Sequence, residues 1–243
     1  MKFTVIGCWG GYPAPNGATS CYLLETRGYS MVLDMASGAL SKLQQFKAIS
    51  DLDVVLLSHY HYDHIADIGV LQYARLVNYY ITGVGRVLPI FAHTEDRDAF
   101  DSLTHSFTKG IEYDPALPLS VGPFTITFLK TKHPVPCYGM RITDGQHVIV
   151  YTADTSYHID WIDFAKNADL LITDCNLYAE QDGTNVGHMT SSEGASIAQQ
   201  ANVKQLILSH LPQYGDKNQL KEEAEQIYQG VIQIAKEGLV WER

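Results

Sequence analysis

Apolar runs and amphipathic stretches alternate along the chain. Runs of four to eight apolar residues are typical of strands, and apolar residues repeating every three or four positions are typical of helices. These patterns predict strands at residues 3–7, 20–26, 29–34, 53–57, 87–92, 125–129, 138–143, 147–151, 169–173 and 205–208. They predict helices at residues 38–46, 65–80, 159–166, 190–201 and 217–236.

Turn and capping signals sharpen several of these boundaries. Asp144-Gly145 between two strand patterns predicts a β-hairpin. Thr190, followed three residues later by Glu193, matches a capping box that opens a helix. Thr94 is the expected N-cap of a further helix, and Gly238 is expected to close the last helix of the chain.

Strands and helices in this order predict an α/β fold. No Ser/Pro/Gly-rich linker divides residues 1–243, so we expect a single domain of two mixed sheets, each flanked by helices. A length of 243 residues fits one large domain or at most two small ones.

Charge and composition exclude some classes of function. With 17 basic and 27 acidic residues, the net charge is −10, which disfavours broad electrostatic binding to nucleic acid or to an anionic membrane. No apolar run is long enough for a transmembrane helix, and the first residues lack the pattern of a signal peptide. The four cysteines are scattered. We therefore expect a cytoplasmic protein with reduced thiols, and no membrane partner.

The chemically informative segment follows the strand at residues 53–57. It places His59, His61, Asp63 and His64 within six positions. Residues two apart in extended chain share a side, so His59 and His61 can hold one metal, while Asp63 and His64 reach a second. A single histidine at a strand end usually has a structural role. Three histidines and an aspartate crowded together predict a metal site, because imidazole and carboxylate are the donors of hydrolytic zinc sites.

One loop cannot complete two metal sites. His133, Asp154 and His210 each come shortly after a predicted strand, at the end where open sheets place ligands. They are the expected additional metal ligands.

The pattern H-x-H-x-D-H at 59–64, followed by these three residues, resembles the metallo-β-lactamase superfamily over nearly the whole chain. The resemblance implies a four-layer αβ/βα sandwich with two metal ions at one edge. It implies a first zinc held by His59, His61 and His133, and a second held by Asp63, His64 and His210. Asp154 and a hydroxide would bridge the two Zn²⁺ ions, with Mn²⁺ as the alternative metal.

Within the superfamily, the ribonuclease Z and phosphodiesterase-like branch is the most similar. The resemblance rests on a Gly/Pro loop from Gly7 to Pro13, on HPVPCYGMR at 133–141, on YTADT at 151–155 and on GHMT at 187–190. It implies that His188 donates a proton or stabilises an oxyanion. The basic arm that grips tRNA in ribonuclease Z is replaced here by a short hairpin at 138–151, which argues against full-length tRNA as the substrate.

His188 is also a candidate on local grounds. It precedes the capped helix at residue 190, whose exposed N–H groups and dipole favour an anion. Alternatively, it is a loop histidine bonded to the backbone. His93, at a strand end, is the best further candidate, whereas His105, His147 and His158 are expected to be structural. Tyrosines beside the ligand motifs either stack on a base or pack, and packing is the commoner role.

We therefore expect a dinuclear zinc hydrolase of small phosphodiesters or short nucleotide ends. Asp63 and Asp154 would orient the attacking hydroxide, and His188 would assist the leaving group. The alternative is a lactone, ester or thioester hydrolase on the same metals. A di-iron redox module is a third reading, disfavoured because His61 stands where Glu is usual in such proteins. A homodimer is the default oligomeric state.

Overall fold

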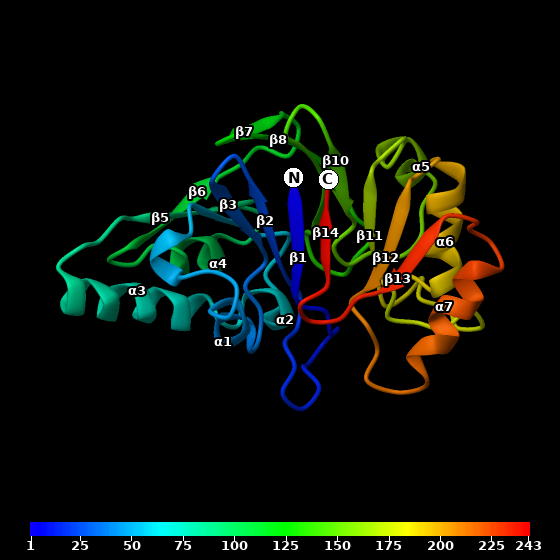
Figure 1. Ribbon diagram of the computed structural model, residues 1–243, viewed down its shortest axis with the longest axis horizontal. Coiled ribbons are helices and arrows are strands. Elements are labelled where there is room, and N and C mark those ends of the chain that lie inside the picture. Colours follow the sequence, from blue (N-terminus) through cyan, green and yellow to red (C-terminus); the bar gives the residue numbers. More distant parts are fainter. The chain divides into compact units, whose positions relative to one another are not determined.

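The computed structural model describes residues 1–243, which divide into two compact units. Unit 1 comprises Met1–Asp114 with Lys236–Arg243, and unit 2 comprises Pro115–Ala235. Each unit contains one seven-stranded sheet with helices packed against it (Figure 1). Two mixed, helix-flanked sheets were expected, and this is confirmed. That they form a single domain stays a prediction.

The sheet of unit 1 has the strand order β14-β1-β2-β3-β4-β5-β6. Strands β14, β1, β2 and β3 pair antiparallel, whereas β3 to β6 are parallel. The two chain ends meet in this unit, because β1 pairs with β14. The strands are β1 (Lys2–Gly7), β2 (Cys21–Thr26), β3 (Tyr29–Leu33), β4 (Val54–Leu56), β5 (Leu88–Ala92), β6 (Thr108–Glu112) and β14 (Val240–Glu242).

The helices of unit 1 bury one face of this sheet. Its helical elements are α1 (Ala39–Leu43), η1 (Ile49–Asp51), α2 (Tyr62–Ile65), α3 (Ile68–Thr82) and α4 (Arg97–Ser102). A single apolar cluster joins Leu43 of α1, Leu71 of α3 and Phe100 of α4 to Val55 and Ile90 of the central strands. This packing holds the loops that follow the parallel strands at one edge of the sheet.

The sheet of unit 2 has the strand order β13-β12-β11-β10-β9-β8-β7. Strands β10 to β13 are parallel, and β7 to β10 are antiparallel. The strands are β7 (Leu119–Val121), β8 (Phe124–Lys130), β9 (Tyr138–Thr143), β10 (Val148–Tyr151), β11 (Leu170–Asp174), β12 (Gln205–Ser209) and β13 (Val231–Ile234). The predicted hairpin at Asp144-Gly145 joins β9 to β10 and is confirmed.

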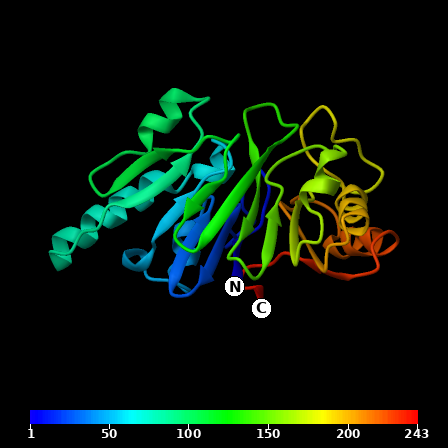
Figure 2. The ribbon, with the colours of Figure 1, turned by 90° about the horizontal axis from the view of Figure 1, so that it is seen from above.

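Helices α5 (Asp160–Phe164), α6 (Ser191–Gln200) and α7 (Lys217–Glu225) lie outside strands β11 to β13 (Figure 1, Figure 2). The predicted capping box is confirmed: the Thr190 hydroxyl accepts from the Glu193 N–H at 3.2 Å, and the Glu193 carboxylate accepts from the Thr190 N–H at 2.9 Å. The capping box therefore fixes the start of α6 at Ser191, three residues after His188.

Several predicted elements were wrong or missing. The predicted helix at 217–236 ends at Glu225, and β13 follows, because Val231–Ile234 pairs in parallel with β12. Gly238, with a φ of 80°, lies in the turn before β14 and does not close a helix. The N-cap of α4 is Asp96, whose carboxylate accepts from the Ala99 N–H, and not Thr94. Short strands β6, β7 and β14 carry too little apolar pattern to be found locally.

All four cysteines are buried and free of disulfides, as expected. None of the helices combines the length and apolar character needed to cross a membrane.

Candidate metal centre

In unit 1, polar residues follow three adjacent parallel strands. Asp34 follows β3, Ser58 and His59 follow β4, and His93 follows β5. The carboxyl ends of parallel strands meet at one edge of a sheet, which is where α/β proteins usually place ligands. The motif found in the sequence therefore lies where its strand context predicted.

The three histidines of the motif lie together. The ring centroids of His59 and His61 are 4.8 Å apart, and those of His59 and His64 are 4.1 Å apart. His61 is the N-cap of α2, so Asp63 and His64 are presented by the first turn of this short helix. Asp63 Oδ2 lies 3.7 Å from His64 Nε2 and accepts from the Gly11 N–H at 2.7 Å. Three imidazoles and a carboxylate thus converge within unit 1.

Asp34 contacts the motif although the sequence did not predict it as a site residue. Its carboxylate is fully buried, with Oδ2 2.8 Å from His64 Nδ1, and it accepts from both the N–H and the hydroxyl of Ser58 at 2.8 Å. The Ser58 hydroxyl in turn lies 3.0 Å from His59 Nδ1. With both Nδ1 atoms engaged, Nε2 is the nitrogen that each ring can offer to a metal, as in carboxylate–histidine–metal arrangements.

Unit 2 repeats this arrangement at the carboxyl ends of β10, β11 and β12. Asp154, Asp174 and His210 follow or end these three parallel strands, and His133 comes three residues after β8. His210 Nε2 lies 3.3 Å from Asp154 Oδ2, and His133 Nε2 lies 4.0 Å from the same oxygen. The three ligands predicted for this half are therefore brought together around the Asp154 carboxylate.

The orientation of His133 depends on Gly187. His133 Nδ1 lies 3.0 Å from the Gly187 carbonyl oxygen. Gly187 has a φ of 78°, and a Cβ at this position would lie 2.6 Å from His133 Nδ1. Glycine is therefore required both by the backbone conformation and by the close approach of the imidazole.

Asp174 connects two histidines of unit 2. Its Oδ2 lies 2.8 Å from His188 Nδ1, and its Oδ1 lies 3.6 Å from His210 Nδ1. Burial alone would raise the pKa of Asp174, but attraction to and hydrogen bonding with His188 and His210 hold it below its usual value. Burial alone would likewise lower the pKa of His188, but the Asp174 carboxylate raises it above its usual value. The Asp174 carboxylate therefore stabilises the protonated form of His188.

Strained backbone accompanies these side chains. Asp34, Ala153 and His210 have positive φ angles of 56°, 51° and 53°. For residues with a Cβ this left-handed conformation costs roughly 1–2 kcal/mol each. Such strain clusters at functional sites, where the surrounding packing maintains it. Each of the three lies just past a parallel strand, at the edge of its own unit's sheet that carries candidate ligands.

The candidates that the sequence left open have different outcomes. His188 stacks on His210 with a centroid distance of 5.1 Å, and Asp174, His188 and His210 form a further group able to hold a metal ion. His93 instead packs against Tyr60, whose hydroxyl donates to the His93 carbonyl oxygen. Tyr62 is exposed and Tyr138 is buried.

The donor chemistry of both sets fits a hydrolytic metal site. Each unit offers imidazole nitrogens and a carboxylate. In each unit a second, buried carboxylate, that of Asp34 or Asp174, lies within hydrogen-bond distance of a histidine Nδ1. These are the donors of zinc, and the buried carboxylates are the outer partners that fix histidine ligands. That the two sets meet in one centre stays a prediction.

Comparison with known proteins places this chain in a family. Residues 32–211 match the family model described as β-lactamase superfamily domain. The chain is 54% identical to the probable metallo-hydrolase YhfI of Bacillus subtilis. The match covers 100% of this chain and 100% of that protein. The crystal structure of YhfI, described as a metallo-β-lactamase fold protein, matches 99% of this chain and 98% of its own with a TM-score of 0.97.

Two further proteins are more distant. A ribonuclease Z of Metallosphaera sedula is 25% identical over 276 aligned positions that cover 94% of each chain. The short form of human tRNase Z is 19% identical, with a TM-score of 0.79, and the match covers 100% of this chain and 99% of that one. The second of these supports the fold alone.

Proposed function

The chain belongs to the metallo-β-lactamase superfamily of metal-dependent hydrolases, and from this premise we propose that it cleaves small phosphodiesters at a dinuclear zinc centre. The ligand sets described in the two units support the proposal. The first zinc site would use His59, His61 and His133, the second Asp63, His64 and His210, and Asp154 would serve both.

The metals would supply Lewis acidity and a water molecule whose pKa is lowered towards neutrality. The protein's own residues would do the rest. Asp63 and Asp154 would orient the attacking water and accept its proton. The hydrogen bond from the Gly11 N–H fixes the Asp63 carboxylate, and His210 Nε2 lies against that of Asp154.

The observation that carries the choice of phosphodiesters is the placement of His188. Asp174 holds its Nδ1 and raises its pKa, so Nε2 can carry a proton for a leaving alkoxide. Thr190, the N-cap of helix α6, lies two residues later, and the N-terminal dipole of this helix favours an anion near its start. A histidine whose protonated form is stabilised, close in sequence to a helix start, would suit a negatively charged phosphoryl group better than a neutral ester.

The neighbouring surface also favours a small substrate. A pocket of about 400 Å³ beside His133 is lined by Lys132, Thr184 and Asn185. Such a volume fits a mononucleotide-sized group and offers one ammonium group to it. Only the compact β9–β10 hairpin lies between His133 and Asp154, where the resemblance to ribonuclease Z implies a tRNA-binding arm, so tRNA is not the proposed substrate. The ribonuclease Z relative is consistent with the same bond being cleaved.

The proposal is tested with zinc- or manganese-loaded protein on a substrate panel. We expect hydrolysis of bis-p-nitrophenyl phosphate and of cyclic nucleotides to exceed that of lactones, carboxylic esters and thioesters. Activity restricted to the carbonyl substrates would contradict the proposal and indicate a lactone, ester or thioester hydrolase on the same metal centre. Iron found in the purified protein, with no hydrolysis, would instead indicate a di-iron redox module.

A further inference from the structure

The segments that follow β11 and β12 stay bonded to each other beyond the ends of these strands. The register of the parallel pair ends at Ser209, one residue before His210. Further along, side chains continue the contact. Asn176 Nδ2 donates to the His210 carbonyl oxygen at 3.1 Å, and the Tyr178 hydroxyl donates to the Tyr214 carbonyl oxygen at 2.9 Å. Two side chains from one segment therefore hold the backbone of the segment that begins with His210.

The spacing of these two side chains fits an extended chain. Asn176 and Tyr178 are two residues apart, so in an extended segment their side chains leave the backbone on the same side. The intervening Leu177 pairs instead with Thr190, the N-cap of α6. The segment after β11 is therefore bonded both to the start of α6 and to the chain after β12.

The contact between Tyr178 and Tyr214 depends on the residue that follows Tyr214. Gly215 has a φ of 71°, and a Cβ there would lie 2.3 Å from the Tyr178 hydroxyl oxygen, so glycine is required at this position. Gln181 supports the same contact, because its Oε1 accepts from the Tyr178 N–H at 2.8 Å and from the Tyr214 hydroxyl at 3.1 Å. Lys217 also donates to the Tyr214 carbonyl oxygen, but this bond lies within one loop and does not join the two segments.

The backbone of His210 is strained and needs such restraint. Its φ of 53° is in the left-handed region, which is unfavourable for a residue with a Cβ. A conformation of this kind persists only where the surrounding contacts hold it. Asn176 holds the His210 carbonyl, and the Tyr178 bond fixes the chain four residues further on. Since His210 Nε2 lies 3.3 Å from Asp154 Oδ2, a change in this backbone would move the imidazole away from the carboxylate.

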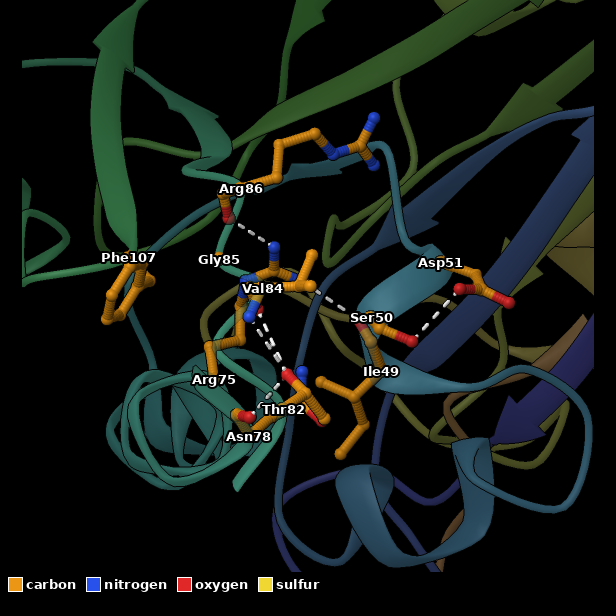
Figure 3. A pocket seen from close by; sticks show the side chains of 10 residues that line it. All are labelled: Ile49, Ser50, Asp51, Arg75, Asn78, Thr82, Val84, Gly85, Arg86 and Phe107. Carbon is orange, nitrogen blue, oxygen red and sulfur yellow. Dashed lines mark hydrogen bonds between the residues drawn. The ribbon is translucent and has the colours of Figure 1, made fainter. Parts of the chain in front are cut away.

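Bonds from a side chain to the backbone of another segment also occur away from the candidate ligands. Arg75 of α3 points into the pocket of about 410 Å³ shown in Figure 3. Its Nη1 donates to the Ile49 carbonyl oxygen at 2.8 Å, and its Nη2 donates to that of Arg86. Neither of these two segments contains a candidate ligand, so the Arg75 bonds serve the fold of unit 1. The bonds of Asn176 and Tyr178 differ, because they end on a candidate ligand and on the loop that follows it.

Resting on the proposed function, in which His210 binds zinc, we propose that Asn176 and Tyr178 are positioning residues for this ligand. They hold its strained backbone, so that Nε2 is in place before the metal binds. Neither residue is itself a metal ligand. A preorganised ligand lowers the ordering cost of binding. One ordinary hydrogen bond corresponds to about a fivefold change in an equilibrium constant, so loss of either side-chain donor should weaken zinc binding by about this factor.

Zinc affinity, measured by competition with a chromophoric chelator, tests the proposal. Tyr178→Phe removes a single hydroxyl. Tyr228→Phe is the matched control, because the Tyr228 hydroxyl donates to the Val203 carbonyl oxygen at 2.8 Å and the two tyrosines are equally buried, at 6% and 5% exposure. Tyr178→Phe should weaken the binding of one of the two zinc ions about fivefold, and Tyr228→Phe should leave both affinities unchanged. Asn176→Ala should resemble Tyr178→Phe.

Hydrogen exchange of the metal-free protein separates positioning from a general loss of stability. In Tyr178→Phe the backbone amides of residues 210–216 should exchange faster than in wild type, while those of α3 keep their protection. In Tyr228→Phe residues 210–216 should exchange as in wild type. Unchanged exchange of residues 210–216 in Tyr178→Phe would overturn the proposal.

The affinities also distinguish this proposal from the proposed function. Equal zinc affinity in Tyr178→Phe and wild type, or an equal loss of affinity in Tyr228→Phe, would overturn the positioning role alone. A wild type that binds zinc but cleaves no phosphodiester would contradict the proposed function, while the zinc affinities of the variants would still decide the role of Tyr178. A wild type that binds no zinc would overturn both.

Discussion

Asp174 Oδ2 lies 2.8 Å from His188 Nδ1, and Asp34 Oδ2 lies at the same distance from His64 Nδ1 in the other unit. Each carboxylate is buried and lies at the end of a parallel strand. Each contacts its histidine at Nδ1, so Nε2 points away from it. A buried carboxylate in this position fixes the tautomer and the ring orientation. Both units thus carry their own outer support for the candidate site.

The first prediction concerns Asp174. Asp174→Asn should lower kcat for bis-p-nitrophenyl phosphate about 10- to 100-fold, because the amide no longer stabilises protonated His188. KM should change much less. The measurement is a steady-state kinetic comparison with His188→Gln and the double variant. We expect the double variant to be no worse than His188→Gln alone; additive losses would show that Asp174 does not act through His188.

The second prediction concerns Asp34. Asp34→Asn should weaken zinc binding about 10- to 100-fold, because His64 and, through Ser58, His59 lose the group that orients them. Zinc affinity is measured by competition with a chromophoric chelator. Asp53→Asn is a matched control, since Asp53 precedes the same strand β4 at its other end. Equal zinc affinity in Asp34→Asn and wild type would contradict the assignment.

The third prediction is a pH dependence of stability at Asp53. Burial alone would raise its pKa, but hydrogen bonds from Ser30 and Arg86 hold it below the ordinary 3.8. A lowered folded-state pKa means that the carboxylate stabilises the folded chain above about pH 3.8, and that this contribution disappears as the pH falls through the folded value. Asp53→Asn should cost about 1 kcal/mol in urea unfolding at pH 7. The difference in free energy of unfolding between Asp53→Asn and wild type should shrink below pH 3.8. A difference that stays constant with pH would contradict the prediction.

The fourth prediction separates helix capping from catalysis. Thr190→Ala and Asp216→Ala each remove an N-cap side chain, of α6 and α7, so each should lower the free energy of unfolding by about 1 kcal/mol. Only Thr190→Ala should also lower kcat, because the start of α6 adjoins His188. Unfolding curves and kinetics of the two variants are the measurement. Equal kcat in the two variants would show that the start of α6 does not contribute to the site.

The sequence could predict whatever depends on local pattern. The 59–64 motif, the hairpin at Asp144-Gly145 and the capping box at Thr190 are each contained in a few consecutive residues, and their local structure was as expected. The short VIQI run at Val231–Ile234 could not be told from a continuation of the helical pattern before it. Its strand identity comes from pairing with β12, far away in the sequence.

Asp34 and Asp174 could not be found in this way. Each is one aspartate at the end of an apolar run, and its role depends on a histidine 30 or 14 residues distant. The one available signal was position: like His59 and His210, both stand at the carboxyl end of a predicted buried strand. The left-handed backbone conformation of Asp34 could not be predicted either, because no glycine marks this position in the sequence.

The central claim is that the chain holds two metal ions through seven ligands, which are His59, His61, Asp63, His64, His133, Asp154 and His210. Counting the bound metal tests this claim most directly. Elemental analysis of the purified protein, loaded with zinc and dialysed, should give two zinc ions per chain. His61→Ala should retain at most one with its fold intact, while the control Asp53→Asn should retain both. A wild type that binds no zinc, or a His61→Ala protein that still binds two, would contradict the account.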